Sequence, residues 1–272
     1  MIAPLRAEPQ DPSSWSTIGN SVEGREIRIR VAGPGSGGTL LIGGLHGDET
    51  ATVLLLEDFA DRFGDSLRQP TAILPIANPD GYHRCSRYNA RGVDLNRNCS
   101  HFWSEHSVEP SGPAPWSEPE ICALRDFILE WKPSRIVSLH WALAEIDADG
   151  GQSRALAEAM WEALDARDRR PYRIRVSEGT LHVPSLPLSY AGCPGSLGQW
   201  CGYALRYEDG KRPAMITLEL PYDPAVNERP DDLPESHLET LREIWKKNAA
   251  GYLQAIEPAI HKMLLAACHF EG

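Results

Sequence analysis

The sequence lacks any apolar run near the ~20 residues that a membrane-spanning helix needs, and its first ten residues include no apolar segment of signal-peptide length. We therefore expect no membrane span, and we expect the chain as given to stay in the cytoplasm. Its six cysteines include no Cys-x-x-Cys pair, which favours reduced thiols over a disulfide framework or a cysteine metal site. Any metal must then be held by histidine and carboxylate side chains.

Basic residues are in the minority, with 27 Lys and Arg against 38 Asp and Glu and a formal net charge of -11. Phosphate groups would repel such a chain, so neither nucleic acid nor an anionic membrane is an expected partner, although the charge also serves plain solubility. The sequence has no internal repeat and no low-complexity linker, and 272 residues with 42% hydrophobic side chains can supply one large core. We expect one domain over residues 1–272; the oligomeric state does not follow from the sequence.

Apolar runs and amphipathic segments alternate along the chain. Strands are predicted at 26–32, 39–45, 71–77, 134–139, 172–176 and 214–220. Helices are predicted at 50–63, after a capping box that begins at Ser117, at 153–167, at 194–205 and at 233–267 with an interruption near Pro258. Asn78-Pro-Asp-Gly81 predicts a turn, and 82–116 a long functional loop. This order predicts an α/β fold in which a mixed, mainly parallel twisted sheet has helices on both faces.

Four side chains of metal and acid–base chemistry follow the ends of predicted strands. His46 and Glu49 come after one strand, His140 ends another, and Glu219 lies near the end of a third. In a parallel sheet these ends meet at one edge. Two imidazoles and a carboxylate are a catalytic zinc donor set, and a second carboxylate can move the proton of the attacking water. His-x-x-Glu alone is common by chance, however, so this pattern needs support from elsewhere in the chain.

A second block supplies that support. The segment Arg87-Tyr-Asn-Ala-Arg-Gly-Val-Asp94-Leu-Asn96-Arg97-Asn98 resembles a characteristic segment of the zinc carboxypeptidase family. Further motifs follow in that family's order over about residues 18–221: Ser21-Val-Glu-Gly-Arg-Glu-Ile27, His46-Gly-Asp-Glu49, Asn78-Pro-Asp-Gly81, Ser138-Leu-His140, Tyr190 before Pro194-Gly-Ser-Leu-Gly198, and Ile216-Thr-Leu-Glu-Leu220. The resemblance implies the family's fold, with the helical stretch 233–267 packed on it, and a hydrolase with one Zn²⁺ per chain.

The resemblance also implies a role for each matching residue. It makes His46, Glu49 and His140 the zinc ligands and Glu219 the general base and acid. The other implied roles are for Arg87 to polarise the scissile carbonyl, Asp94 to hold the ring N–H of His46, Asn96 and Arg97 to grip a substrate carboxylate, and Tyr190 to close over the substrate.

Each residue taken alone also has a plain structural interpretation. His140 fits a core histidine, Glu219 a buried ion-pair partner and Tyr190 a core aromatic. Asp94 and Asn96 fit turn caps, while Arg84, Arg87 and Arg91 fit a solvated basic face, and Cys193 a small apolar wall residue. A second metal is not expected at His261, Cys268 and His269, because no carboxylate has ligand spacing among them.

Asp48 separates this chain from digestive carboxypeptidases, which have an arginine between the first two ligands. In this and in its Tyr190 and His140 motifs, the chain is most similar to bacterial murein peptide amidases. That family implies a cytoplasmic enzyme of cell-wall (peptidoglycan) recycling that cuts the γ-D-glutamyl–meso-diaminopimelate bond of a small murein peptide. Asp48 would then accept an ammonium group of diaminopimelate. The alternatives for Asp48 are to orient a ligand or to cap the helix that begins at Thr50.

Two other functions remain open from the sequence. One is an N-acyl amino acid deacylase of the succinylglutamate desuccinylase or aspartoacylase type, which shares the His-x-x-Glu site. The other is an inactive protein that binds peptides or wall fragments. Loss of a ligand or of the base would favour inactivity, and neither is missing here.

Overall fold

The computed structural model describes residues 15–177, 193–223 and 238–271, and eight strands form one sheet within them. The strands are β1 (Trp15–Asn20), β2 (Glu26–Ala32), β3 (Thr39–Ile42), β4 (Thr71–Leu74), β5 (Arg135–Trp141), β6 (Glu145–Asp149), β7 (Arg173–Ser177) and β8 (Ala214–Leu220). The α-helices are α1 (Thr50–Phe63), α2 (Pro79–Arg84), α3 (Pro119–Trp131), α4 (Arg154–Glu162), α5 (Leu197–Gln199) and α7 (Leu238–His269). Short 3₁₀ turns are η1 (Gly64–Ser66), η2 (Leu95–Arg97) and η3 (Gly151–Ser153), and a π-helix, η5 (Trp200–Ala204), follows α5.

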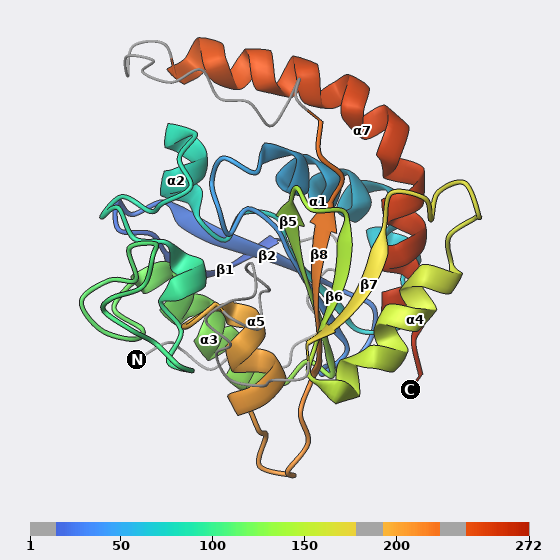
Figure 1. The fold of residues 1–272 in the computed structure, drawn as a ribbon, viewed down its shortest axis with the longest axis horizontal. Helices are drawn as coiled ribbons and strands as arrows, with labels where there is room; N and C mark the ends of the chain where they lie inside the picture. The colour runs from blue at the N-terminus through green and yellow to red at the C-terminus, as the bar shows by residue number, and fades with distance from the viewer. Residues whose placement is uncertain (1–14, 178–192, 224–237, 272) are drawn as a thin grey trace.

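The sheet runs in the order β1-β2-β4-β3-β5-β8-β6-β7, and its centre is parallel. The pairs β3–β4, β3–β5 and β5–β8 are parallel, as is the edge pair β6–β7, whereas β1–β2, β2–β4 and β6–β8 are antiparallel. The twisted sheet crosses the middle of the molecule, with helices in front of it and behind it (Figure 1). The predicted α/β architecture is confirmed.

Alternate residues of the central strands contribute to two separate hydrophobic cores, one on each face of the sheet. Leu41, Val137 and Ile216 pack with α1, α4 and α7, whereas Leu40, Ile136 and Met215 pack with α3 and the α5–η5 segment. This follows from the two-residue side-chain period of a strand. His140 and Glu219 are in step with Ile136 and Met215, so both project from the face that α3 and α5 cover.

The carboxyl ends of β3, β4, β5 and β8 lie at one edge of the sheet because these strands are parallel. At this edge His140 of β5 pairs in register with Glu219 of β8. The antiparallel strand β6 begins at the same edge, where Glu145 lies opposite Glu219. The register therefore places two candidate site residues on neighbouring strands.

Several local predictions are wrong, for reasons of capping and context. The segment from Asn78 is not a simple turn but the start of α2, since the Asn78 side chain accepts a hydrogen bond from Gly81 N at 2.9 Å and caps the helix. Helix α3 has Glu118, not Ser117, at its N-cap; the Ser117 hydroxyl donates to the Glu118 carboxylate instead. Strands β1 and β6 are absent from the prediction.

The predicted C-terminal helix is continuous where an interruption was expected. Pro258 lies inside α7, which is one helix of 32 residues and changes direction along its length in Figure 1. Such a bend fits an internal proline, which removes one backbone hydrogen bond without ending the helix when packing holds both halves. Ile260, Met263 and Leu264 of α7 are fully buried in the core shared with α1 and α4.

Within the described residues, no helix is long and apolar enough to cross a membrane. The assignment of residues 1–272 to one domain stays a prediction.

Candidate metal centre

The first two candidate ligands lie in the short crossover between β3 and α1. Hydrogen bonds from backbone N–H groups fix this loop: Gly44 N donates to the Thr52 side-chain Oγ1 at 3.0 Å, and Glu49 N donates to His46 O at 3.2 Å. Gly47 packs against the start of α2 so closely that a Cβ there would come within 2.0 Å of the Gly81 carbonyl carbon. Only glycine fits at position 47, and the loop thus presents His46 and Glu49 inward.

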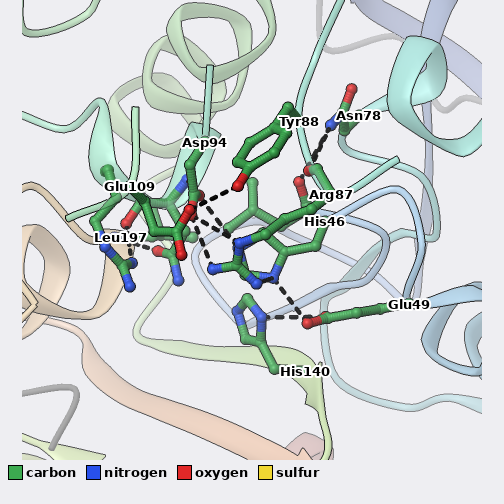
Figure 2. Close-up of polar contacts among 12 residues, drawn as sticks. His46, Glu49, Asn78, Arg87, Tyr88, Asp94, Glu109, His140 and Leu197 are labelled. Carbon is green, nitrogen blue, oxygen red and sulfur yellow. Dashed lines mark hydrogen bonds and ion pairs between the residues drawn. The ribbon is translucent and has the colours of Figure 1, made fainter. Parts of the chain in front are cut away.

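The side chains of His46, Glu49 and His140 converge from this loop and from β5 (Figure 2). Each offers a donor atom, and these atoms lie within 4.8 Å of one another. His46 Nδ1 is 2.8 Å from Glu49 Oε1, and His140 Nδ1 is 3.3 Å from Glu49 Oε2. All three residues are buried. The structure therefore brings together the three predicted ligands, with the Nδ1 atoms of both rings directed at one carboxylate.

The second nitrogen of each ring is held from outside. His46 Nε2 lies 3.2 Å from Asp94 Oδ1, and His140 Nε2 lies 3.0 Å from Ser138 Oγ. A carboxylate at Nε2 keeps the proton on that nitrogen and so directs the Nδ1 lone pair of His46 inward. Two imidazole nitrogens, each on a ring with its outer contact in place, and one carboxylate fit a zinc ion.

Charge at the centre is balanced by His46. Burial lowers the pKa of His46, but the Glu49 and Asp94 carboxylates outweigh it and raise that pKa to about 9. Burial raises the pKa of Glu49, yet His46 and His140 bring it down to about 2. The pKa of Asp94 is likewise lowered well below its usual range, because His46 and Arg87 overcome the cost of burial. Without metal, His46 is thus an imidazolium between two carboxylates at neutral pH.

Zinc uptake is therefore expected to release a proton from His46. Since the imidazolium cannot ligate, apparent zinc affinity should rise about tenfold per pH unit below pH 9 and level off above it. A chelator-competition titration of metal-free protein from pH 6 to pH 10 measures this slope. A flat affinity between pH 7 and pH 9 would contradict the assigned charge.

Replacing Ser138 by alanine is expected to weaken zinc binding by about 10- to 100-fold, because the ring of His140 loses its outer contact. Activity should then return when zinc is added in excess. Ser134→Ala is a matched control, since Ser134 precedes the same strand at the opposite edge and its hydroxyl contacts Gly38 O at 3.3 Å. Equal zinc affinity in wild type and Ser138→Ala would show that the Ser138 hydroxyl does not contribute to zinc binding through His140.

Arg87 lies beside the donors and is held by Asp94. Its Nε and Nη2 donate to Asp94 Oδ2 at 3.0 and 2.8 Å, and its Nη1 is 3.3 Å from His46 Nδ1 (Figure 2). Burial lowers the pKa of Arg87, but the facing carboxylates raise it further than burial lowers it. Arg87 is thus a fixed cation at the centre, and the interpretation as a solvated basic face does not hold for it.

Asn96 and Arg97 follow Asp94 in η2, and both are buried. Asn96 Oδ1 accepts a hydrogen bond from Leu197 N at 2.9 Å, so the amide connects η2 to the start of α5. Arg97 Nη1 donates to Asn96 O at 2.7 Å. Asp94 does cap a turn, since its Oδ1 accepts from Asn96 N at 2.8 Å, while the same oxygen faces His46.

Asp48 lies between the two ligands of the loop, and its capping alternative is wrong. The N-cap of α1 is Glu49, whose side chain makes no capping bond, and Thr50 N bonds to the backbone oxygen of Asp48 at 2.9 Å. Burial and the nearby Glu49 raise the pKa of Asp48, whereas His46 and Arg87 oppose them. Tyr190 falls outside the described residues.

Two contributors to the centre were not predicted from the sequence. Ser138 belongs to the Ser138-Leu-His140 motif, and the strand period alone indicates its position, because a hydroxyl two residues before His140 on one strand shares its face. Asn78 lies 3.5 Å, through Nδ2, from both Leu45 O and Arg87 O, so it connects the ligand loop to the arginine segment (Figure 2). Leu45 lies 33 residues and Arg87 nine residues from Asn78 in the sequence, and neither spacing indicates the contact.

Comparison with known proteins agrees with this geometry. Residues 1–146 match the zinc carboxypeptidase family. Murein peptide amidase A of Escherichia coli (strain K12) is 33% identical over 177 residues, which cover 60% of this chain and 65% of that protein. The match thus spans just under two thirds of that relative. Carboxypeptidase B of Astacus astacus is 30% identical over 224 residues, covering 66% of this chain and 74% of that protein.

Solved structures agree on the fold. The crystal structure of murein-tripeptide amidase from Escherichia coli O157 superposes with a TM-score of 0.60 at 24% identity, covering 97% of this chain and 98% of the other. Carboxypeptidase A from Helicoverpa armigera gives a TM-score of 0.62 at 22% identity, covering 95% and 69%. With a family match over more than half of its length, the chain belongs to the zinc carboxypeptidase family.

Proposed function

We propose that this protein is a zinc-dependent amidase that hydrolyses the γ-D-glutamyl–meso-diaminopimelate bond of small murein peptides. The observation that carries the proposal is the donor set itself: two imidazole Nδ1 atoms and the Glu49 carboxylate, buried and within 4.8 Å, beside a further buried carboxylate at Glu219. The similarity to murein peptide amidase A supports the choice of substrate.

His46, Glu49 and His140 would hold one zinc ion, which supplies a Lewis acid that lowers the pKa of water toward ~7. Glu219 takes the proton of the attacking water and passes it to the leaving amine. Water is thereby added across the amide: the carbonyl carbon gains the oxygen, and the nitrogen gains the proton. The register pairing of Glu219 with His140 supports this role, because it holds the base next to a ligand.

Arg87 stabilises the oxyanion that forms at the carbonyl, an electrostatic role that is typically worth about 3 kcal/mol. Its two hydrogen bonds to Asp94 support the assignment, since they hold the guanidinium in place before substrate arrives. Asp94 therefore orients two groups at once, the ring of His46 and the guanidinium of Arg87.

The two ends of diaminopimelate suit the charged residues around the centre. Arg97 with Asn96 would take a carboxylate, for which a planar guanidinium is suited. Asp48 would take the ammonium group, and Tyr190 would cover the substrate. The assignment of Asp48 to the ammonium group is supported by its partly buried side chain, whose Oδ1 has no hydrogen-bond partner among the residues that the structure describes. Recycling of wall peptides in the cytoplasm is the setting that such a substrate implies.

Asp48→Asn is expected to raise KM for L-Ala-γ-D-Glu-meso-diaminopimelate by about 10-fold, as one charge-assisted hydrogen bond is lost. For an analogue of this peptide that lacks the distal ammonium group of diaminopimelate, KM should change less than twofold. Steady-state kinetics on both peptides provide the comparison. Equal increases in KM would assign Asp48 to the ligands and not to the substrate.

The proposed activity is tested by incubating the zinc-loaded protein with L-Ala-γ-D-Glu-meso-diaminopimelate and measuring free diaminopimelate. We expect its release, with little release of a C-terminal residue from a peptide whose glutamate is linked through its α-carboxyl. A protein that cleaves only the α-linked peptide would be a carboxypeptidase of the general type. Cleavage of neither peptide, by protein that contains zinc, would overturn the proposal.

A further inference from the structure

A second group of metal-ligand side chains lies between α1 and α7, apart from the first centre. Asp58 of α1 and Glu257 and His261 of α7 each offer one donor atom, and these atoms lie within 4.8 Å of one another. Glu257 and His261 are four residues apart on one helix and therefore share a face. The sequence indicates no site here because Asp58 comes from a distant part of the chain. Packing of α7 on α1 brings it into place.

His261 is buried and directed at a carboxylate. Its side chain is 6% exposed, and its ring contacts the rings of Phe59 and Phe63, with centroids 5.7 and 5.1 Å away. Nε2 lies 3.5 Å from Asp58 Oδ2 and has no hydrogen-bond partner within the described chain, whereas Asp58 Oδ2 is also 2.9 Å from Arg62 Nε. Nδ1 lies 3.7 Å from Glu257 Oε1.

The imidazole nitrogen marks where this arrangement is incomplete. His261 Nε2 is buried without a hydrogen-bond partner among the described residues, and Asp58 Oδ2 lies 3.5 Å away. A buried polar atom of this kind is costly, and a cation between the imidazole and the two carboxylates would contact all three groups.

Arg62 now supplies a cation to the carboxylates but not to the imidazole. Its Nε donates to Asp58 at 2.9 Å, and its Nη1 is 2.7 Å from Glu257 Oε1. The side chain of Arg62 is 54% exposed, so it can turn into solvent at little cost. A guanidinium only donates hydrogen bonds, whereas a metal ion placed between the three side chains would accept an electron pair from each of them.

We propose that Asp58, Glu257 and His261 form a second zinc site that joins α7 to α1, and that Arg62 leaves the carboxylates when the metal binds. One imidazole with two carboxylates suits zinc, whereas Mg²⁺ and Ca²⁺ prefer oxygen donors alone. The site is structural, because its donors come from α1 and α7, and neither helix supplies a donor to the first centre. It is independent of the substrate proposed above.

The test is a titration of metal-free full-length protein with Zn²⁺ against a chromophoric chelator. Wild type should bind two zinc ions in separable steps. His261→Asn and Glu257→Gln should each weaken the second step by more than about 100-fold, since loss of a ligand costs at least as much as loss of an outer contact. Mg²⁺ should not compete for that step.

Arg62→Ala decides the case even where a donor variant fails to fold, because it keeps all three donors and removes the competing cation. It should tighten the second step about 10-fold. His106→Asn is the matched control, since its side chain is 86% exposed beside Glu105, and it should change neither step. A single zinc in both wild type and Arg62→Ala, or a second step that persists unchanged in His261→Asn, would overturn the proposal.

Discussion

Replacing Glu219 by glutamine is expected to lower kcat on the murein tripeptide by about 10³- to 10⁴-fold, because an amide cannot take the proton of the attacking water. KM should change little, since Glu219 is not assigned to substrate binding. Zinc content should stay at the wild-type level, because the three donors come from β5 and from the loop before α1. The measurement combines steady-state kinetics with metal analysis of the same preparation.

The control for this variant keeps the carboxylate but moves it. Glu219→Asp retains an acid on β8 and shortens its reach by one methylene, so it should recover part of the lost rate. A Glu219→Gln variant with wild-type kcat would remove Glu219 from the mechanism. Loss of both zinc and activity would instead indicate that Glu219 contributes to metal binding.

Replacing His46 by asparagine should abolish zinc binding and activity, and it should also destabilise the metal-free protein. In the absence of metal, His46 lies between Glu49 and Asp94, with its two nitrogens 2.8 and 3.2 Å from their oxygens. Asparagine is similar in shape but cannot carry the compensating charge. Loss of the cation from a fully buried group of this kind typically costs about 3–5 kcal/mol of unfolding free energy. Urea unfolding in the presence of a chelator measures it.

The stability difference should depend on pH in a definite direction. The pKa of His46 is raised in the folded state, from 6.5 to about 9. Its contribution is therefore complete below pH 6.5 and is lost as the pH rises through 9, where the folded imidazole becomes neutral. Metal-free wild type and His46→Asn should differ most at pH 6 and converge near pH 10. A difference that is the same at both pH values would show that His46 stabilises the fold by packing alone.

The order of the central elements could be predicted from the sequence because each obeys one local rule. Helix α1 and strand β8 begin and end where their apolar period does, at Thr50–Phe63 and Ala214–Leu220. In these two elements the apolar residues that set the helical or strand spacing are also the buried ones, so the spacing alone locates the element. The three donors lie at or just beyond the ends of such elements, but their assignment as ligands rests on the family resemblance, because His-x-x-Glu alone is common by chance.

Strand β6 was missed because its polar residues are buried. Glu145, Asp147 and Asp149 alternate with Ile146 and Ala148, and all five are buried. Acidic residues at every second position indicate an exposed edge strand or a loop, but the antiparallel pairing with β8 places this face beside Glu219. Exposed Arg173 pairs with Glu145, and Thr217 donates to Asp149 at 2.9 Å. Partners that come from other strands are not visible in a local pattern.

The sequence could name the donors but not their supports. Asp94 was assigned to His46 through the family resemblance, yet its second partner, Arg87, follows only from the folded loop. Asn78 illustrates the same limit: the proline after it indicated a turn, whereas the side chain caps a helix and reaches two backbone carbonyls. The contact between Asn78 and Leu45 joins residues 33 positions apart, and the other pairs, three to nine residues apart, depend on how the intervening segment folds.

The strand order has a consequence for how activity arises during synthesis. All three metal donors belong to the part of the chain that ends with β5, and β5 pairs directly with β3. Glu219 comes on β8, which adds to the other side of β5 only after a much longer stretch has left the ribosome. We therefore expect a chain that ends before β8 to contain all three donor residues and to lack the proposed base, so that it would have no hydrolytic activity even where it retained metal.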